Sequence, residues 1–441
     1  MDKNELKAQA LAYHRYPMPG KIETIPTKPF GSPEELALAY SPGVAFPCLD
    51  IARDSSNVYR YTDRGNCVGV ITNGTAVLGL GNIGPEAAKP VMEGKAMLFK
   101  IFAGLDAFDI EIDETDPKKF IEIVRALAPT FGGINLEDIK APECFEIEDG
   151  LAGKIGIPVM HDDQHGTAVI VAAAMINAAE IQGKNLADIK MVVNGAGAAA
   201  IACTRLLEKV GVSHSNIVMC DSRGVINSLR TGLSPHKAYF AVDAAAGATL
   251  ADALKGADAF LGLSVADVVT PDMVRSMAPK PIVFALANPN PEIALEAAHS
   301  AADDIVYATG RSDYPNQINN VLGFPYIFRA ALDCRASVIN DAMKVAAAHA
   351  IAALARKPAP GAVRAIYPGE SLAFGPDYIL PKPFDRRLLA AVSPAVVKAA
   401  VDSGVSARPI RNLEHYGRQL EQYVSRTDEH MQKFLRTAGV G

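Results

Sequence analysis

The sequence predicts an α/β protein: a Rossmann-type NAD(P)-binding domain with a parallel sheet, preceded by an N-terminal α/β domain that binds substrate and metal. Two observations indicate the parallel sheet. From about residue 166 onward, helical segments alternate with short β-rich runs, which is typical of a parallel sheet covered by helices. One of these runs passes into the glycine-rich stretch Val192–Ala200. A third observation, acidic clusters after two earlier β-rich runs, indicates the N-terminal domain.

The first 60 residues are rich in proline, and a short helix is expected over Ser32–Tyr40, with Ser32 as its cap and Pro33 in its first turn. Two β-rich runs then flank Asn73 and Gly74, a combination that predicts a β-hairpin. Helical patterns follow over 85–102 and 117–128. A strand is expected between them at 108–112, and a strand and loop within 131–139.

The second half alternates more regularly. Strands are expected at 191–193, 216–221, 259–264, 281–289 and 305–310, with helices up to residue 181 and over 199–210 and 250–255. A proline-rich stretch over 356–376 indicates a loop or linker, and a charged helical tail ends the chain. We therefore expect a substrate and metal domain over 1–163, a dinucleotide-binding domain over 164–389 and a helical segment over 390–441.

Composition and charge exclude several classes of protein. The 441 residues suggest two or three domains of roughly 150 residues each. The net charge of −6 is scattered and forms no basic stripe, so we expect neither nucleic acid nor a membrane as partner. The longest apolar run, Thr167–Gly183, contains Asn177 and is shorter than the roughly 20 apolar residues of a membrane span, so it predicts a buried helix.

Cysteine spacing and the N-terminus bear on the compartment. The six cysteines are dispersed without a CxxC motif, which is typical of a reduced, cytoplasmic protein. The first residues are polar and contain no apolar signal core. We expect a cytoplasmic location.

Two glycine runs compete for the dinucleotide. Val77–Gly84 ("VLGLGNIG") matches GxGxxG letter for letter, whereas in Val192–Ala200 ("VVNGAGAAA") the third glycine is replaced by Ala200. The fingerprint requires a strand, a tight turn, a helix whose N-terminus faces the pyrophosphate, and an acidic residue after the next strand. The second run meets each requirement, with an acid 24 residues after its second glycine, although an incidental helix start is the alternative. The cofactor candidates are Gly195, Ala196, Gly197, Ala198, Asp221, Ser222 and Arg223.

The first glycine run lies next to the expected hairpin, which implies antiparallel pairing at that point. We interpret it as a substrate-side loop whose backbone amides approach an anionic ligand.

Two residues of the first 100 are candidates for proton transfer. Tyr40 adjoins a Ser-Pro-Gly turn and is able to present its phenol to a cleft, but a packed tyrosine is the alternative. Lys95 follows Gly94 on an expected helix. If Lys95 is buried, its pKa is lowered toward neutrality and the residue is able to act as a base. The alternative is an ordinary lysine on the solvated face of the helix.

Two acidic clusters suggest a metal site. Glu137 with Asp138, and Asp162 with Asp163, each follow an expected strand, and clustered carboxylates suit a hard cation such as Mg²⁺ or Mn²⁺. A solvated acidic loop is the alternative. The spacing of His161 and His165 suggests zinc, but the helix after Gly166 puts both histidines at or before its start, which disfavours zinc.

Taken together, these stretches resemble the malic enzymes over nearly the whole chain. The resemblance runs from "YHRYPMPGKIE" through "NGTAVLGLGNIGPEAAKPVMEGKAMLFK", "GGINLEDIKAPE" and "PVMHDDQHGTA" to "ALANPNPEI" and "YPNQINNVLGFPYIFRAALD". It is strongest for the bacterial NADP-dependent branch. The long bacterial relatives continue into a phosphotransacetylase-like domain, which we do not expect in a sequence that ends at Gly441.

The resemblance implies oxidative decarboxylation of (S)-malate to pyruvate and CO₂ by at least a dimer. It implies that Lys95 is the base that takes the hydroxyl proton and Tyr40 the acid that protonates the enol, with Asp162 close by. The implied metal ligands are Glu137, Asp138 and Asp163. Asn288 and Asn320 resemble the cofactor- and substrate-side amides, with Lys95 also contacting substrate.

Two features of the sequence bear on how the substrate carboxylate is held and on which dinucleotide is used. The animal branch carries an arginine for a substrate carboxylate where this sequence has Thr75 and Ala76, so we expect Asn288, Asn320 and the amides of 79–84 to hold that carboxylate. Asp221 favours an unphosphorylated ribose, whereas Arg223 and Arg230 suit a 2′-phosphate. We expect NADP, with NAD as the alternative.

Three rival functions remain at this point: a metal-dependent oxaloacetate decarboxylase, a non-catalytic nucleotide-sensing module and an amino-acid dehydrogenase. The last has no need of the paired carboxylate clusters.

Overall fold

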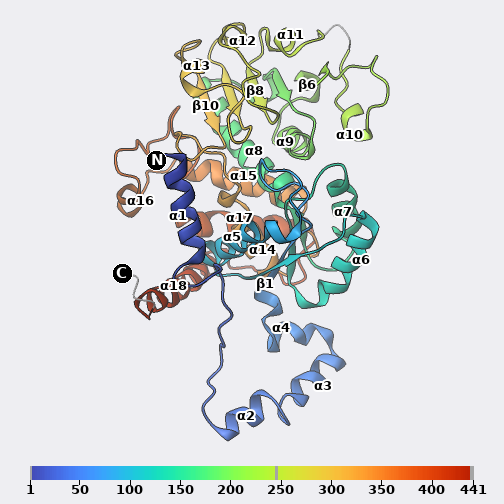
Figure 1. Cartoon of the computed structure of the whole chain (residues 1–441), viewed down its shortest axis with the longest axis vertical. Helices are drawn as coiled ribbons and strands as arrows, with labels where there is room; N and C mark the ends of the chain where they lie inside the picture. The colour runs from blue at the N-terminus through green and yellow to red at the C-terminus, as the bar shows by residue number, and fades with distance from the viewer. Residues whose placement is uncertain (1, 244–246, 438–441) are drawn as a thin grey trace.

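Two β-sheets form the frame of the protein (Figure 1). The computed structural model describes residues 2–243 and 247–437. The N-terminal sheet has the order β2-β1-β3-β4, with all pairs parallel: β1 (Cys67–Thr72), β2 (Asp106–Glu111), β3 (Gly133–Leu136) and β4 (Val159–His161).

The second sheet has the order β10-β9-β8-β5-β6-β7, and only the edge strand β7 is antiparallel. Its strands are β5 (Met191–Asn194), β6 (Ile217–Asp221), β7 (Gly224–Val225), β8 (Ala259–Gly262), β9 (Ile282–Ala285) and β10 (Val306–Thr309). The parallel order confirms the α/β class and the Rossmann-type sheet.

Helices connect and cover the strands. In the first part of the chain they are α1 (Lys3–Arg15), α2 (Pro33–Ala39), α3 (Ala45–Arg53), α4 (Val58–Tyr61), α5 (Pro85–Ala103), α6 (Pro117–Leu127), α7 (Glu143–Leu151) and α8 (Asp162–Gln182). The later helices are α9 (Ala198–Lys209), α10 (Pro235–Ala238), α11 (Leu250–Leu254), α12 (Pro271–Arg275), α13 (Leu295–His299), α14 (Phe324–Asp333), α15 (Asp341–Ala355), α16 (Gly361–Ile366), α17 (Arg387–Asp402) and α18 (Leu413–Thr437).

The predicted hairpin at Asn73 and Gly74 is wrong. β1 does not fold back on a following strand; its neighbours β2 and β3 are both parallel to it. The amides of Ile83 and Gly84 donate to the carbonyl of Gly74, which closes 74–84 into a loop that leads directly into α5. Gly74 has φ +67°, and a Cβ there would lie 2.1 Å from the Gly84 carbonyl oxygen, so the glycine serves a close backbone approach.

A continuous apolar core joins the two sheets. α8 is buried along most of its length, which confirms the buried helix predicted from its apolar run. Phe324 and Phe328 of α14 pack edge-on against Phe99 of α5, with ring centroids 4.8 and 5.3 Å apart. A helix from the second half of the chain therefore covers the N-terminal sheet. The division at 163/164 and 389/390 stays a prediction, and residues 438–441 of the last segment lie outside the described residues.

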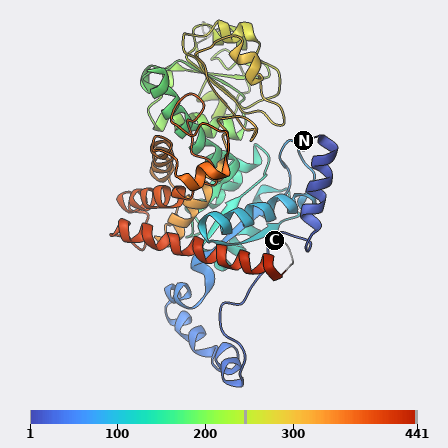
Figure 2. The same cartoon turned by 90° about the vertical axis from the view of Figure 1, so that its left-hand side faces the viewer.

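An arm formed by α2 and α3 extends away from both sheets, as two perpendicular views show (Figures 1 and 2). The predicted cap of α2 is confirmed, because Ser32 Oγ accepts a hydrogen bond from the Glu35 amide. Neither helix of the arm has a buried residue, and its exposed apolar side chains are Leu36, Leu38, Tyr40, Val44, Phe46 and Leu49. Such an apolar surface is typical of a contact with another chain.

Within 2–243 and 247–437, none of the helices combines the length and apolar character that a membrane crossing requires.

Asn177 is a fully buried polar residue of α8, and it links three segments. Its amide donates to the carbonyls of Ala352 and Ile379 at 2.9 and 2.8 Å, and its oxygen accepts from Arg356 Nε.

We expect Asn177→Ala to lower the free energy of unfolding by about 2–4 kcal/mol, because two buried carbonyls lose their donor and a cavity forms. Urea titration of the intact chain measures this. The exposed Gln9→Ala is the control, with an expected change of about 0.5 kcal/mol or less, and equal values for the two variants would contradict the assignment.

Candidate active site

Acidic side chains gather at the carboxyl edge of the N-terminal sheet. Glu137 and Asp138 follow β3, while Asp162 and Asp163 open α8 directly after β4. Because β3 and β4 are parallel neighbours, their carboxyl ends meet at one edge of the sheet. The prediction that each acidic cluster follows a strand is confirmed.

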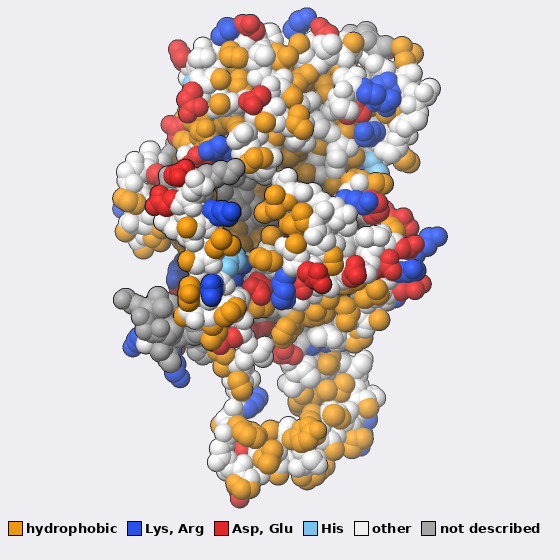
Figure 3. All heavy atoms as spheres, in the orientation of Figure 1, with side chains coloured by type: hydrophobic (Ala, Val, Ile, Leu, Met, Phe, Trp, Pro, Cys, Tyr) orange, Lys and Arg blue, Asp and Glu red, His pale blue; other side chains and the backbone are white. Residues whose placement is uncertain are grey.

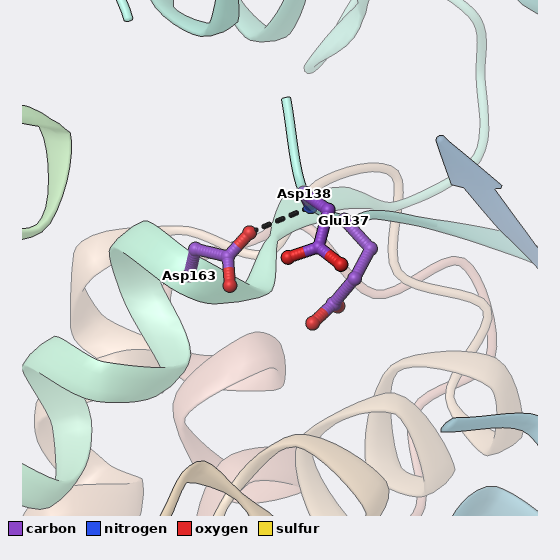
Figure 4. A group of neighbouring side chains, drawn as sticks. All are labelled: Glu137, Asp138 and Asp163. Atoms are coloured by element: carbon purple, nitrogen blue, oxygen red, sulfur yellow. Dashed lines mark hydrogen bonds between the residues drawn. The ribbon is translucent and has the colours of Figure 1, made fainter. Parts of the chain in front are cut away.

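Glu137, Asp138 and Asp163 offer oxygen atoms that lie within 4.8 Å of one another (Figure 4). The Asp138 amide donates to Asp163 Oδ2 at 2.8 Å, which fixes the two segments together, and Asp138 has the left-handed φ of +54°. Its Oδ2 atom is buried and has no hydrogen-bond partner among the described residues. An oxygen-only donor set with an unsatisfied buried atom fits a hard divalent cation.

The electrostatics of these carboxylates point the same way. Burial raises the pKa of Asp138 to about 7, with a further rise from the charge of Asp163. Burial also raises the pKa of Glu137 well above its usual range, against the opposing effect of Lys95. Both side chains are only 4% exposed, so for these two residues the alternative of a solvated acidic loop is wrong. A bound cation would offset the repulsion among these groups.

Lys95 of α5 lies beside this cluster and is 7% exposed. Its Nζ lies 2.9 Å from Glu137 Oε1 and 2.6 Å from Asp162 Oδ2, and 4.2 Å from the centroid of the Phe324 ring. Asn320, which opens the 3₁₀ helix η7 (Asn320–Leu322), donates to the same Asp162 oxygen at 2.5 Å. The fold therefore brings together Lys95, Asp162, Asn320 and Glu137 from four separate segments.

The expectation that burial brings the pKa of Lys95 toward neutrality is wrong. Burial does lower the pKa of the ammonium, but the charges of Asp162 and Glu137 outweigh burial and hold that pKa above its usual value. The alternative of a solvated helical lysine is wrong as well, since Lys95 is buried and paired.

Three residues that support the site were not predicted from the sequence. A Cβ at Gly166 would lie 1.9 Å from Asp162 Oδ1, so a glycine makes room for that carboxylate. Asn135 donates to Glu137 Oε2 at 2.8 Å. Glu148 of α7 accepts from the His161 amide and from His165 Nε2 at 2.9 and 3.0 Å.

Of these three residues, only Gly166 could have been noticed in the sequence, as a glycine three residues after Asp163. Glu148 could not, because an acidic residue on a helix usually indicates a solvated face. A zinc site at His161 and His165 is not supported, because the three-ligand cluster found among the described residues contains neither histidine.

The second glycine run has the predicted strand–turn–helix geometry. β5 ends at Asn194, Gly197 is the N-cap of α9, and the helix begins at Ala198. Gly195 has φ +122°, and a Cβ there would lie 2.3 Å from the Leu263 carbonyl oxygen, so only glycine fits. Asp221 ends β6, the parallel neighbour of β5, and the exposed Ser222 and Arg223 follow it. This places free helix amides and the strand-end acid where a dinucleotide-binding fold uses them.

The first glycine run follows β1 of the N-terminal sheet and faces the second sheet. A Cβ at Gly79 would lie 3.5 Å from the backbone oxygen of Asn288, which follows β9 and is exposed. The loop therefore adjoins the carboxyl edge of the second sheet. The argument that gave it a substrate-side role from a neighbouring hairpin is wrong, because no hairpin forms at Asn73 and Gly74.

Tyr40 lies apart from these groups. It is the C-cap of α2 on the arm and is 71% exposed, so the alternative of a tyrosine packed within its own chain is wrong. Figure 1 shows α2 at the far end of the arm, away from α5, the helix that carries Lys95.

Fold and site together define the class: a two-sheet α/β protein in which a Rossmann-type dinucleotide fold adjoins an acidic, lysine-containing site. Family models match over most of the chain, "Malic enzyme, N-terminal domain" at residues 19–152 and "Malic enzyme, NAD binding domain" at 164–371. The chain belongs to the malic enzyme family.

Individual relatives agree with this assignment. The chain is 55% identical to the NADP-dependent malic enzyme of Escherichia coli over 99% of its own length, but spans only 57% of that relative. It is 56% identical to the NADP-dependent malic enzyme of Halomonas elongata, covering 91% of this chain and 94% of that one. The crystal structure of the malic enzyme from Pyrococcus horikoshii superposes with a TM-score of 0.90 at 42% identity, covering 98% and 99% of the two chains.

The raised pKa of Asp138 predicts that a divalent cation would bind to this cluster in a pH-dependent way. Its pKa of about 7 lies above the 3.8 of an unperturbed aspartate, so the ionised carboxylate destabilises the metal-free fold increasingly as pH rises from about 4 to about 7. We expect Mn²⁺ to raise the Tm by roughly 5 °C at about pH 8 and by much less at about pH 5.5, where a proton competes for the site.

Differential scanning calorimetry at the two pH values measures this difference. Asp138→Asn is the control, with a small Mn²⁺ shift at both pH values. Equal shifts for the unaltered protein at both pH values would contradict the site.

Proposed function

We propose that this chain catalyses the oxidative decarboxylation of (S)-malate to pyruvate and CO₂, with NADP as hydride acceptor and NAD as the alternative. The observation that carries the proposal is the buried Lys95, held between Asp162 and the carboxylates of Glu137, Asp138 and Asp163. The NADP-dependent malic enzymes of E. coli and H. elongata, each at least 55% identical, support the same reaction and the bacterial NADP-dependent branch.

Lys95 takes the proton of the malate hydroxyl at Nζ during hydride transfer. Before that step the ammonium must give up its own proton, and Asp162 Oδ2 at 2.6 Å is placed to receive it. Burial raises the pKa of Asp162, which favours this acceptance. Asn320 donates to the same oxygen and holds Asp162 in position.

The three carboxylates supply the metal site. When bound by Glu137, Asp138 and Asp163, Mg²⁺ or Mn²⁺ supplies Lewis-acid chemistry toward an oxygen of the substrate. These residues follow β3 and β4, which are rigid elements, so their oxygens are held before substrate binds.

We assign binding of the substrate carboxylate to Asn320, Asn288 and the backbone amides of the 79–84 loop. Thr75, which stands near the position of the arginine of the animal branch, is unavailable for this role. Its hydroxyl donates to Asn73 Oδ1 at 2.7 Å and accepts from the Lys140 amide at 3.0 Å.

Formation of NADPH from malate, followed at 340 nm with Mg²⁺ and with Mn²⁺, tests the reaction. Pyruvate must accumulate in equal amount. Pyruvate from oxaloacetate without NADPH from malate would instead indicate the decarboxylase, and dinucleotide binding without turnover would indicate the sensing module.

Lys95→Ala tests the base directly. We expect malate oxidation to fall by at least ~10³-fold, since general base catalysis of this kind contributes about 10²–10⁴-fold and the substrate also loses a contact. Cofactor affinity, measured by NADPH fluorescence, should stay nearly unchanged because Lys95 lies on α5 and not in the glycine turn before α9. A variant with more than a tenth of the original activity would exclude Lys95 as the base.

We further propose a homo-oligomer, at least a dimer, in which Tyr40 acts in the site of a second copy. The arm that carries Tyr40 has an apolar surface without buried residues, visible at the lower end of the molecule (Figure 3). An apolar arm that packs on an identical chain, related by two-fold symmetry, would be buried and would carry Tyr40 away from its own sheet. The phenol would then act as the acid that protonates the enol.

Mixing two inactive variants tests the shared site. Tyr40→Phe and Lys95→Ala subunits, refolded together in equal amounts, should recover about a quarter of the original activity. Half of the dimers are then hybrids, and one of the two sites in each hybrid is intact. The singly substituted proteins, refolded alone, are the controls. No recovery in a mixture that demonstrably contains hybrids would contradict action in the second copy.

We also propose a cytoplasmic location, supported by the six cysteines, all of which are free.

A further inference from the structure

A fully buried carboxylate lies at the carboxyl edge of the second sheet. Glu292, between β9 and α13, is 0% exposed. Its Oε1 atom accepts hydrogen bonds from the Ser264 amide at 2.8 Å and from the Ser264 hydroxyl at 3.1 Å. Its Oε2 atom accepts from the Ala287 amide at 3.0 Å. Glu292 therefore joins the loop after β8 to the loop after β9, and all three of these donors are uncharged.

A glycine leaves the space that this carboxylate occupies. A Cβ at Gly262, the last residue of β8, would lie 2.4 Å from Glu292 Cδ, so a larger residue does not fit there. Burying a carboxylate costs free energy unless hydrogen bonds replace those that it made to water. What Glu292 adds to the fold is a fixed geometry, because its three hydrogen bonds hold two loops together.

The loop after β8 leads to the glycine turn. The Ser264 hydroxyl, which donates to Glu292, also accepts from Asn194 Nδ2 at 2.7 Å. Asn194 ends β5 and directly precedes Gly195, and its carbonyl accepts from the Leu263 amide at 2.8 Å. Through Ser264, Glu292 is therefore connected to the turn before α9.

The loop after β9 leads to Asn288. Ala287, whose amide donates to Glu292, directly precedes Asn288. The Asn288 side chain lies close to Gly310, where a Cβ would be 3.5 Å from Asn288 Oδ1. A shift of Ala287 would therefore move the Asn288 amide, which we assign to the substrate carboxylate.

The order of the strands gives these links a meaning for hydride transfer. A dinucleotide lies across the carboxyl edge of such a sheet, with its pyrophosphate at the glycine turn after β5 and its adenosine toward the acid after β6. The nicotinamide half then lies on the other side, toward β8 and β9. Hydride transfer requires the reacting atoms to be held about 3–3.5 Å apart.

We propose that Glu292 is a positioning residue that fixes the distance between the glycine turn and Asn288, and with it the distance between the nicotinamide and the substrate. It acts through Ser264 and Ala287, because a side chain that is 0% exposed touches neither ligand. This role rests on the proposed function and adds a residue to it.

Glu292→Gln tests the role at nearly constant side-chain size. One carboxylate oxygen is replaced by an NH₂ donor, so one of the two backbone amides faces a donor instead of an acceptor. We expect kcat with malate and NADP to fall by roughly 10- to 100-fold, because a displacement of about 1 Å costs up to 10²-fold. The KM for malate should rise at least ~5-fold through the displaced Asn288.

A loss of folded protein would give a different result. Fewer active molecules lower kcat but leave unchanged both the KM for malate and the isotope effect measured with malate deuterated at C2. A misplaced Asn288 raises the KM, and a slower hydride transfer raises the isotope effect on kcat. Glu296→Gln, the same change at an exposed acid of α13, is the matched control and should alter neither quantity.

Ser264→Ala tests one link alone and decides the question if Glu292→Gln does not fold. It removes an exposed hydroxyl but keeps both backbone hydrogen bonds to Glu292. We expect the Kd of NADPH, measured by fluorescence, to rise by about 3- to 5-fold because Asn194 loses its acceptor beside the glycine turn. The KM for malate should change by about two-fold or less. An unchanged Kd of NADPH would contradict the link to the turn.

The unaltered chain separates a failure of this role from a failure of the proposed function. If it forms NADPH from malate and Glu292→Gln has the same KM for malate, the positioning role is overturned and the proposed reaction stands. If the unaltered chain forms no NADPH from malate, the proposed function itself fails, and the role of Glu292 fails with it.

Discussion

The buried ion pairs of Lys95 with Asp162 and Glu137 are the interaction around which the site is organised. Charges removed from water are stabilised when they are paired and hydrogen-bonded. Here Asn320 and Asn135 supply further hydrogen bonds to these carboxylates, and the Phe324 ring faces the ammonium. The pairing joins α5, the end of β3, the start of α8 and η7, so elements from both halves of the chain depend on it.

The two sheets explain why chemistry gathers where it does. The carboxylates lie at the carboxyl edge of one parallel sheet, and the glycine turn before α9 lies at the carboxyl edge of the other. α14 packs against α5 across the boundary predicted from the sequence, and the apolar core runs through both halves. This continuous packing holds the acidic cluster and the glycine turn before α9 in one frame, whereas the arm that bears Tyr40 lies outside it.

The elements that the sequence predicted well are those with a strong local cause. The Ser32 cap, the buried α8 and the strand–turn–helix around Gly195 each follow from a few adjacent residues. The hairpin at Asn73 and Gly74 failed because the same local signal serves a different contact, the close approach of Gly74 to the Gly84 backbone. Sequence alone also could not assign Glu148 or Asn135, because their partners come from other segments or depend on a particular side-chain geometry.

The sequence by itself determined which residues are candidates for chemistry: the resemblance named the lysine, the tyrosine and the metal-binding carboxylates, and the strand pattern indicated the edges at which they lie. Only the tertiary structure decided their electrostatic state and their partners. Burial was expected to lower the pKa of Lys95, but two carboxylates from distant segments reverse that direction. Asp221 was a candidate ribose ligand, but in the structure its oxygens accept hydrogen bonds from Arg230 and Lys237. Both reversals have one physical reason: the energy of a charge depends on which other charges the fold places within a few ångströms of it.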